Sequence, residues 1–124
     1  MRVMSVEDIH FMGIKVVYSH LIDNGYDVLQ VRKEIDIDPQ ILAKKENRFV
    51  LVVVKTAVYP KMGVLSPNVA VKVQNLAIEK QALSYFASVG IANANGESDS
   101  EMAMPILNGE YYINFNGLVP ITIF

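Results

Sequence analysis

The first part of the chain has the hydrophobic periodicity of an amphipathic helix. Apolar residues recur every three or four positions between residues 5 and 24, which predicts a helix over that range. Ser5 and Asp8 have the spacing of a capping box at its start. Asn24-Gly25 supplies a stop, because glycine accepts the left-handed conformation needed there. The face that we expect to be buried carries Val6, Ile9, Gly13, Val16, Val17 and His20.

Three segments after this helix have the pattern of β-strands. Apolar and polar residues roughly alternate from Tyr26 to Arg32, and two further strands are predicted at Gln40 to Ala43 and Phe49 to Thr56. Residues 44 to 47 form the predicted hairpin loop between the second and third strands. The run FVLVVV is apolar on both faces and rich in β-branched residues. It therefore predicts a central strand that is covered on both sides.

A second helix is predicted after a loop rich in turn-forming residues. Ser66-Pro67 combines an N-cap residue with proline at the first helical position. The helical pattern runs from there to about Val89, where Gly90 ends it. Its predicted apolar stripe consists of Val71, Ile78, Ala82, Tyr85 and Val89.

The C-terminal part is predicted to form a hairpin. Met102 to Leu107 and Glu110 to Phe115 flank Asn108-Gly109, a strong hairpin signal. Within the second strand we expect Tyr111, Ile113 and Phe115 to face the core, which leaves Tyr112 outward. Leu118 to Phe124 adds one more short strand. The predicted order is α-β-β-β-α-β-β, an α/β (α+β) fold with a central mixed sheet.

Composition narrows the class of protein. The 124 residues suffice for a single domain over residues 1–124, and 52% hydrophobic with 19% charged residues argues against disorder. The longest apolar run, Phe49 to Val54, is far shorter than the about 20 residues of a membrane span. The absence of cysteine excludes disulfides and thiolate chemistry. Charged residues near the start argue against a secretory signal, so we expect a cytoplasmic protein without membrane partners.

Two segments in the middle carry a family resemblance. Pro39-Gln40-Ile41-Leu42-Ala43-Lys44-Lys45 is followed by an apolar strand that ends Val53-Val54-Lys55-Thr56. This pattern resembles the PD-(D/E)xK nucleases, a superfamily that includes restriction endonucleases and Holliday-junction resolvases. Its members often read Pro-Asp, two apolar residues, Ala, a polar hairpin, and a strand ending Glu-x-Lys-Thr. The resemblance covers roughly residues 5 to 90. It implies a restriction-endonuclease-like core, with a mixed sheet flanked by two main helices.

The signature is degenerate at both metal-binding positions. Gln40 stands where the family has aspartate and Val53 where it has glutamate, so that only Lys55 survives. In the active relatives these carboxylates hold Mg²⁺, which activates the attacking water. Glutamine offers one neutral oxygen and valine none. The sequence therefore predicts a catalytically inactive, nuclease-like binding or interaction module that has no metal site and no cofactor.

Two alternatives stay open at this level. Asp36, Asp38 and Glu7 could replace the missing carboxylates and restore a Mg²⁺-dependent DNA nuclease around Lys55. Residues two apart on a strand are displaced by about 6.6 Å, however, which is wide for a shared ion. The other alternative is a homo-oligomeric structural protein, for example a homodimer, that pairs through the C-terminal hairpin and has no nucleic-acid ligand.

The sequence leaves the partner unidentified, with nucleic acid and protein as the two candidates, and the basic residues bear on the choice between them. Lys55 either reaches solvent at the strand end or pairs with an acid such as Asp38, unless it keeps an anion-binding role. A cluster on the predicted hairpin is a candidate phosphate contact, although it encloses Glu46 and resembles an ordinary solvated loop. It consists of Lys44, Lys45 and Arg48. The net charge of −2 does not indicate a strong nucleic-acid binder.

Other chemical motifs are absent from the sequence. His10 and His20 are ten residues apart, whereas a helical metal-ligand pair needs a spacing of three or four. We expect each to be a partly buried or exposed, hydrogen-bonded histidine. The chain contains neither a phosphate-binding glycine loop nor a serine in a GxSxG context.

Overall fold

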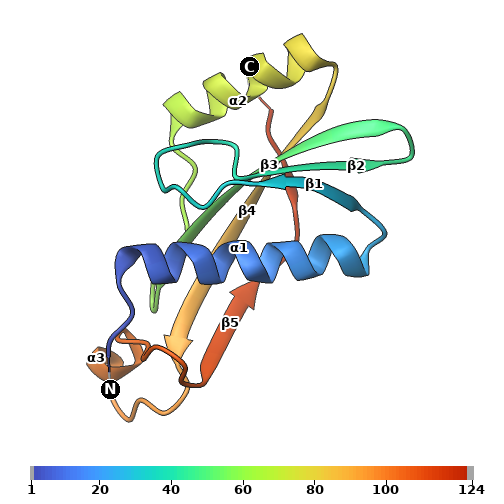
Figure 1. The fold of residues 1–124 in the computed structure, drawn as a ribbon. Helices are drawn as coiled ribbons and strands as arrows, with labels where there is room; N and C mark the ends of the chain where they lie inside the picture. The colour runs from blue at the N-terminus through green and yellow to red at the C-terminus, as the bar shows by residue number, and fades with distance from the viewer. Residues whose placement is uncertain (1, 123–124) are drawn as a thin grey trace.

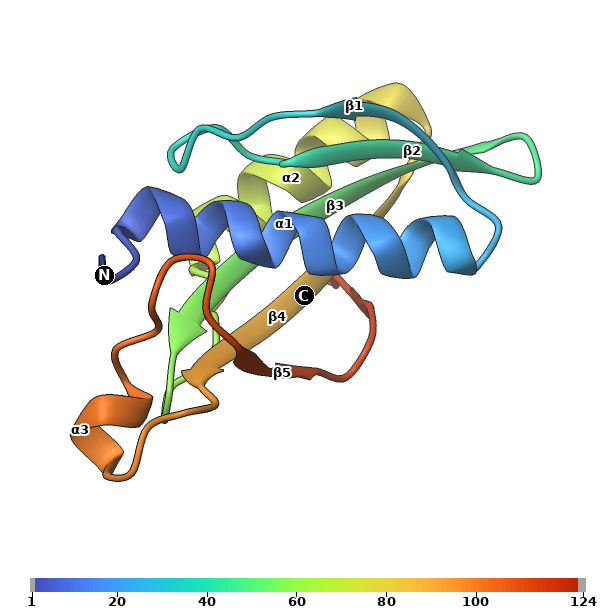
Figure 2. The ribbon, with the colours of Figure 1, turned by 60° about the horizontal axis from the view of Figure 1, so that its bottom comes forward.

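The computed structural model describes residues 2–122, which form a mixed β-sheet with one long helix on each face (Figure 1). Figure 2 shows helix α1 crossing one face of the sheet and helix α2 lying behind the other. The elements in chain order are α1 (Val6–Asp23), β1 (Asp27–Val31), β2 (Ile41–Lys45), β3 (Arg48–Val58), α2 (Pro67–Lys80), β4 (Leu83–Asn93), α3 (Asp99–Met102), β5 (Tyr111–Phe115) and β6 (Val119–Pro120). The prediction of an α+β fold with a central mixed sheet is confirmed. None of the helices in residues 2–122 combines the length and the hydrophobicity that crossing a bilayer requires.

The sheet has the order β1-β2-β3-β4-β5, and β6 pairs with the other end of β4. Strands β1, β2 and β3 are antiparallel neighbours, and α2 then crosses over so that β4 runs parallel to β3. Strand β3 is central and buried from Val50 to Val54, as its sequence predicts. Val50, Val52 and Val54 pack with α1 residues, whereas Leu51 and Val53 pack with α2 residues. The unbroken apolar run is thus explained by a helix on each side.

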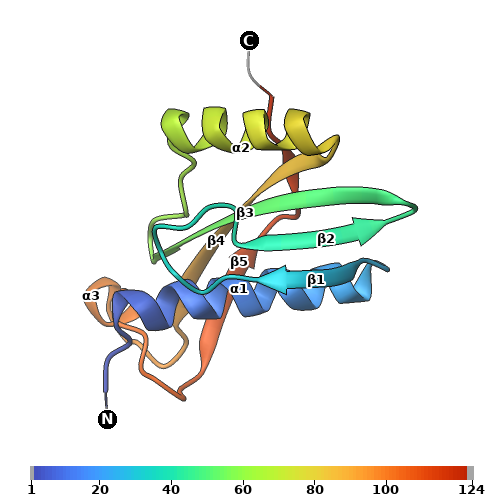
Figure 3. The same cartoon turned by 45° about the horizontal axis from the view of Figure 1, so that its top comes forward.

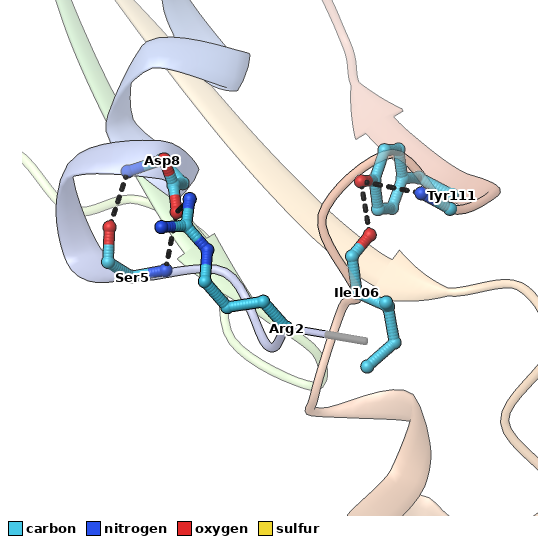
Figure 4. Close-up of polar contacts among 6 residues, drawn as sticks. Arg2, Ser5, Asp8, Ile106 and Tyr111 are labelled. Atoms are coloured by element: carbon cyan, nitrogen blue, oxygen red, sulfur yellow. Dashed lines mark hydrogen bonds and ion pairs between the residues drawn. The ribbon is translucent and has the colours of Figure 1, made fainter.

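The predicted capping of α1 is confirmed (Figure 4). The Asp8 backbone N–H donates to the Ser5 hydroxyl at 3.1 Å, and the Ser5 N–H donates to the Asp8 carboxylate at 2.9 Å. This backbone hydrogen bond from Ser5 lowers the pKa of Asp8 below its ordinary value. Asn24 caps the other end, and Gly25 follows with a φ of 82°. The N-cap at Ser5 and the helix end at Asn24-Gly25, both predicted from the local sequence, are therefore confirmed.

The buried face of α1 differs from the predicted one. Val6 is 67% exposed, because the first turn of the helix contributes little to the interface with the sheet. The residues that are buried are His10, Gly13, Ile14, Val17 and Leu21. Gly13 permits a close approach to β3, since a Cβ atom there would lie 1.7 Å from the Thr56 hydroxyl. Packing against the sheet, rather than hydrophobicity alone, selects the face.

The second predicted helix is too long. Helix α2 begins at Pro67 with Ser66 as its N-cap, as expected, but it ends at Lys80, and strand β4 takes the remaining residues. Strand β4 forms because it pairs along its length with β3, a partner more than 30 residues earlier in the chain. The predicted stripe is wrong as well, since Val71 and Ile78 are 46% and 66% exposed. Val73 and Ala77 are the buried residues of α2.

The predicted C-terminal hairpin does not form. Asn108 adopts a φ of 64° in a tight turn, but the segment before it is the short helix α3 followed by a loop. That loop meets the N-terminal segment through a bridge between Val3 and Ile106. Strand β5 pairs with β4 instead of with its predicted hairpin partner. The observed order is therefore α-β-β-β-α-β-α-β-β, because the edge of β4 is available to β5.

The side-chain prediction for β5 is partly correct. Tyr112 is 61% exposed, as expected, but Ile113 is also 41% exposed, because the edge strand is not covered at its centre. Tyr111 and Phe115 pack against the core, and the Tyr111 hydroxyl donates to the Ile106 carbonyl (Figure 4). The strand predicted at Leu118 to Phe124 is reduced to Val119–Pro120. Its last two predicted residues, Ile123 and Phe124, lie outside the described residues.

Candidate functional site

The two degenerate signature positions lie on either side of the start of the β2–β3 pairing. Gln40 directly precedes β2, Val53 lies in β3, and the paired register begins at Ile41 and Val52. The Gln40 backbone N–H donates to the Val52 carbonyl at 3.1 Å. Both side chains are fully buried. Neither side chain supplies a carboxylate.

The Gln40 side chain makes three hydrogen bonds within the protein. Its Nε2 donates to the Asp38 carboxylate at 2.7 Å and to the Ile37 carbonyl at 3.1 Å. Its Oε1 accepts from the Val54 backbone N–H at 2.7 Å. Both donors and the carbonyl oxygen of the amide are thus used. Gln40 holds the segment before β2 against β3, and its oxygen is engaged with the backbone.

Lys55 forms an ion pair with Asp38. The Lys55 Nζ lies 2.8 Å from the Asp38 Oδ1, the same oxygen that accepts from Gln40. The side chains of Lys55 and Asp38 are only 22% and 5% exposed. Of the outcomes that the sequence leaves open for Lys55, the structure selects pairing with Asp38 rather than extension into solvent. The positive charge is balanced inside the protein, which reduces its ability to attract an external anion.

His10 lies near this ion pair and was not identified from the sequence as part of it. The side chain projects from α1 and is buried, and its Nε2 has no hydrogen-bond partner within residues 2–122. Burial and then the Lys55 charge lower the pKa of His10 below its usual 6.5, although Asp38 and a Glu34 backbone hydrogen bond oppose them. The net effect favours the neutral form of this histidine. Its spacing from Gly13, Ile14 and Val17 was the signal that it shares the buried face.

The other candidate acids do not converge on Lys55. Asp36 is exposed in the loop before β2, and Glu7 is exposed in the first turn of α1. Only Asp38, of the acids proposed from the sequence, reaches the amine. Within residues 2–122 there is no group of three His, Asp or Glu side chains that could hold a metal ion.

The basic residues of the hairpin make contacts of their own. The predicted four-residue loop is shorter in the structure, because Lys44 and Lys45 belong to β2, and Glu46 and Asn47 turn with φ of 52° and 64°. The Lys44 ammonium lies 5.4 Å from the centre of the Phe49 ring. Lys45 lies 4.7 Å from the Tyr26 ring centre and donates to the Asn24 carbonyl at 2.8 Å. The third member of the cluster, Arg48, is exposed.

Comparison with known proteins places the chain in a family. The family model described as "Domain of unknown function (DUF8840)" matches residues 7–121, so the chain belongs to this family. The match extends from the first turn of α1 to the residue after β6. No curated protein and no solved structure matches the chain.

Proposed function

We propose that this protein is a degenerate member of the PD-(D/E)xK nuclease-like superfamily that binds a partner without cleaving nucleic acid. The order α1-β1-β2-β3-α2-β4, with β4 parallel to β3, supports the proposal because it agrees with the core that the sequence resemblance implies. This support is an analogy of fold. The proposed lack of catalysis therefore rests on the residues that stand at the metal-binding positions of the active relatives.

The observation that carries it is that Gln40, Asp38 and Lys55 are bonded to one another or to the backbone. The Gln40 carbonyl oxygen accepts from the Val54 N–H, Val53 has no ligand atom, and Asp38 is paired with Lys55. A metal-dependent nuclease uses its ion to activate water and to stabilise charge on the phosphate. Loss of that ion forfeits several kcal/mol, which corresponds to a rate decrease on the order of 10³-fold or more. A protein with this site is therefore suited to binding rather than hydrolysis.

A cleavage assay tests the catalytic part of the proposal. The purified full chain is incubated with plasmid and branched DNA over a range of Mg²⁺ and Mn²⁺ concentrations, and metal binding is followed by calorimetry. We expect no metal-dependent cleavage and no saturable Mg²⁺ binding. The control variants are Lys55→Ala and Lys61→Ala, the second in an exposed loop. Metal-dependent cleavage that only Lys55→Ala abolishes would overturn the proposal and favour an active nuclease that uses Asp38.

A binding assay identifies the class of partner. Gel shifts with short duplexes and branched DNA are measured at low and moderate salt. A nucleic-acid partner predicts a shift that weakens as salt rises, because phosphate contacts release counterions. If the hairpin contacts phosphates, neutralising Lys44 and Arg48 weakens that shift, whereas neutralising Lys72 on α2 does not. Absence of any shift would favour the alternative of a homo-oligomeric structural protein without a nucleic-acid ligand over a DNA-binding protein.

A further inference from the structure

A groove lies on the α2 face of the sheet, beside the area that α2 covers. Helix α2 packs over β3 and β4, whereas β1 and β2 extend to one side of it (Figure 3). The groove has a volume of about 460 Å³ and is bounded by the second half of α2 and by β1, β2 and β3. Its floor follows the register of the sheet, in which Leu42 pairs with Gln30 on one side and with Leu51 on the other.

The lining of the groove is mainly apolar. Leu51 is only 3% exposed and forms part of the floor, whereas the Phe49 ring is 42% exposed. The apolar lining residues are Pro39, Leu42, Phe49, Leu51, Leu76 and Ala82. Binding sites for small molecules have volumes of roughly 300–1,000 Å³, are mostly apolar, and contain a few placed polar groups. The size and lining of this groove agree with that description.

The charges of the groove are all positive. Arg32 and Lys80 contribute to its lining, and no acidic residue does. The backbone N–H of Arg32 donates to the Gln40 carbonyl at 2.8 Å, which anchors this residue beside the groove. Six other cations of the described residues have a partner: Arg2 and Lys55 pair with a carboxylate, and Lys15, Lys33, Lys44 and Lys45 lie over an aromatic ring. The exposed Arg48, Lys61 and Lys72 have neither contact, but they do not line the groove. Within residues 2–122, neither contact is present for Arg32 or Lys80.

We infer that this groove binds a small amphipathic anion. The apolar body of the ligand lies against Leu42, Leu51 and Leu76, and its anionic head is bound by Arg32 and Lys80. A guanidinium matches the geometry of a carboxylate or a phosphate, and an ammonium adds a second point charge. The lack of lining acids removes the repulsion that would oppose such a head. This inference goes beyond the proposed function and does not depend on the nuclease resemblance.

A pair of fluorescent probes tests the anionic requirement. The full chain is titrated with 8-anilinonaphthalene-1-sulfonate and with N-phenyl-1-naphthylamine, which has the same rings but no sulfonate. We expect saturable binding of one sulfonate probe per chain, about tenfold tighter than binding of the neutral probe. Arg32→Gln and Lys80→Gln should each weaken sulfonate binding about fivefold to tenfold and leave neutral-probe binding within about twofold.

Matched controls separate the groove from general charge and from folding. Lys61→Gln and Lys72→Gln each remove one positive charge at exposed positions outside the lining. Neither should change the affinity for either probe by more than about twofold. Phe49→Ser removes a groove wall and should weaken both probes. A urea unfolding midpoint is measured for each variant, and the binding comparison uses variants whose midpoint is unchanged.

Competition identifies the head group. Octanoate and octyl phosphate are each used to displace the sulfonate probe, with octanol as the uncharged analogue. We expect at least one of the two anions to displace the probe at about one tenth of the octanol concentration, and the better one identifies a carboxylate or a phosphate head.

Three results would overturn the inference. These are an absence of saturable sulfonate binding, equal affinities for the two probes, and equal weakening by the groove variants and their charge controls. None of them bears on the cleavage assay, so the inference and the proposed function fail separately.

Discussion

Two adjoining regions that meet at Gln40 differ in how their polar groups are bonded. At the first, which we call the closed end, Asp38, Gln40 and Lys55 are bonded to one another and to the backbone. At the second, the groove end, Arg32 and Lys80 stand beside an apolar depression, and no carboxylate within residues 2–122 forms an ion pair with either. Gln40 lies at the boundary, because it belongs to the hydrogen-bond network and also lines the groove.

The difference separates groups that stabilise the fold from groups that are available to a ligand. A buried polar group that is satisfied within the protein loses that partner if a ligand takes it, at a cost of about 1–3 kcal/mol. A cation without an internal partner has no such cost. Substitutions at the closed end should therefore change the free energy of unfolding, and substitutions at the groove end should change binding. Four predictions test this division, from the largest expected effect on stability to the smallest.

Breaking the ion pair should have the largest effect. Asp38→Asn removes the charge that balances Lys55, whose side chain is only 22% exposed. We expect the free energy of unfolding to fall by about 3 kcal/mol, because an unpaired charge is left in a poorly solvated position. Urea denaturation measures the change. The matched control is Asp36→Asn at an exposed position, which should stay within about 0.5 kcal/mol of wild type. Equal losses of stability in the two variants would mean that the Asp38 carboxylate stabilises the fold no more than an exposed carboxylate does, which would contradict the comparison.

Removal of the Gln40 amide should have the next largest effect. Gln40→Ala leaves the Val54 N–H without its partner in a fully buried position. We expect a loss of about 2 kcal/mol from the unsatisfied group and the vacated space. Gln30→Ala makes the same change at an exposed position of the groove wall and should cost less than about 0.5 kcal/mol. The two glutamines thus compare the two ends directly, and similar losses in urea denaturation would contradict the comparison.

His10 should produce an acid-side loss of stability. The pKa of His10 is lower in the folded protein than its ordinary value of 6.5. The unfolded chain therefore binds more protons between these two values, so the free energy of unfolding falls as the pH decreases below about 6.5. Thermal or urea unfolding between pH 5 and 8 measures this slope.

Two histidine variants assign that slope. His10→Gln should flatten the pH dependence below about 6.5, whereas His20→Gln, at a half-buried position on the same helix, should retain it. An unchanged slope in His10→Gln would mean that other groups, rather than this buried imidazole, cause the acid sensitivity.

Neutralising a groove cation should have the smallest effect on stability. Arg32 is exposed and makes no side-chain ion pair within residues 2–122. Arg32→Gln should therefore change the free energy of unfolding by less than about 0.5 kcal/mol, while it weakens binding of the sulfonate probe. If urea denaturation shows that the free energy of unfolding falls by more than about 1 kcal/mol, Arg32 stabilises the fold, and the proposed difference between the two ends is contradicted.

Much of the structure up to the start of α2 was predictable because its signals are local. The capping box of Ser5 and Asp8, the Asn24-Gly25 stop and the Ser66-Pro67 start depend on residues within one turn of each other. The central position of β3 followed from its apolar run. These features need no knowledge of the rest of the fold, which is why sequence periodicity and end signals identified them.

The C-terminal half was less predictable because its partners are distant. Residues 83–93 fit a helical pattern, but they form β4 because β3 offers a parallel partner along its length. Asn108-Gly109 has the signal of a hairpin, but β5 pairs with β4 instead. In both regions a long-range pairing outweighed a local preference.

The sequence alone determined which chemistry the candidate site lacks, because Gln40 and Val53 carry no carboxylate whatever their position. It also limited Lys55 to three possibilities: exposure to solvent, an ion pair with an acid such as Asp38, or the binding of an anion. Only the tertiary structure showed that Asp38 forms an ion pair with the Lys55 amine and that His10 is buried near this pair. It also showed that Arg32 and Lys80 line the same groove. The physical reason is that residue type is a property of each position, whereas pairing, burial and the shape of a groove arise when the loop before β2, the sheet and the two helices pack together.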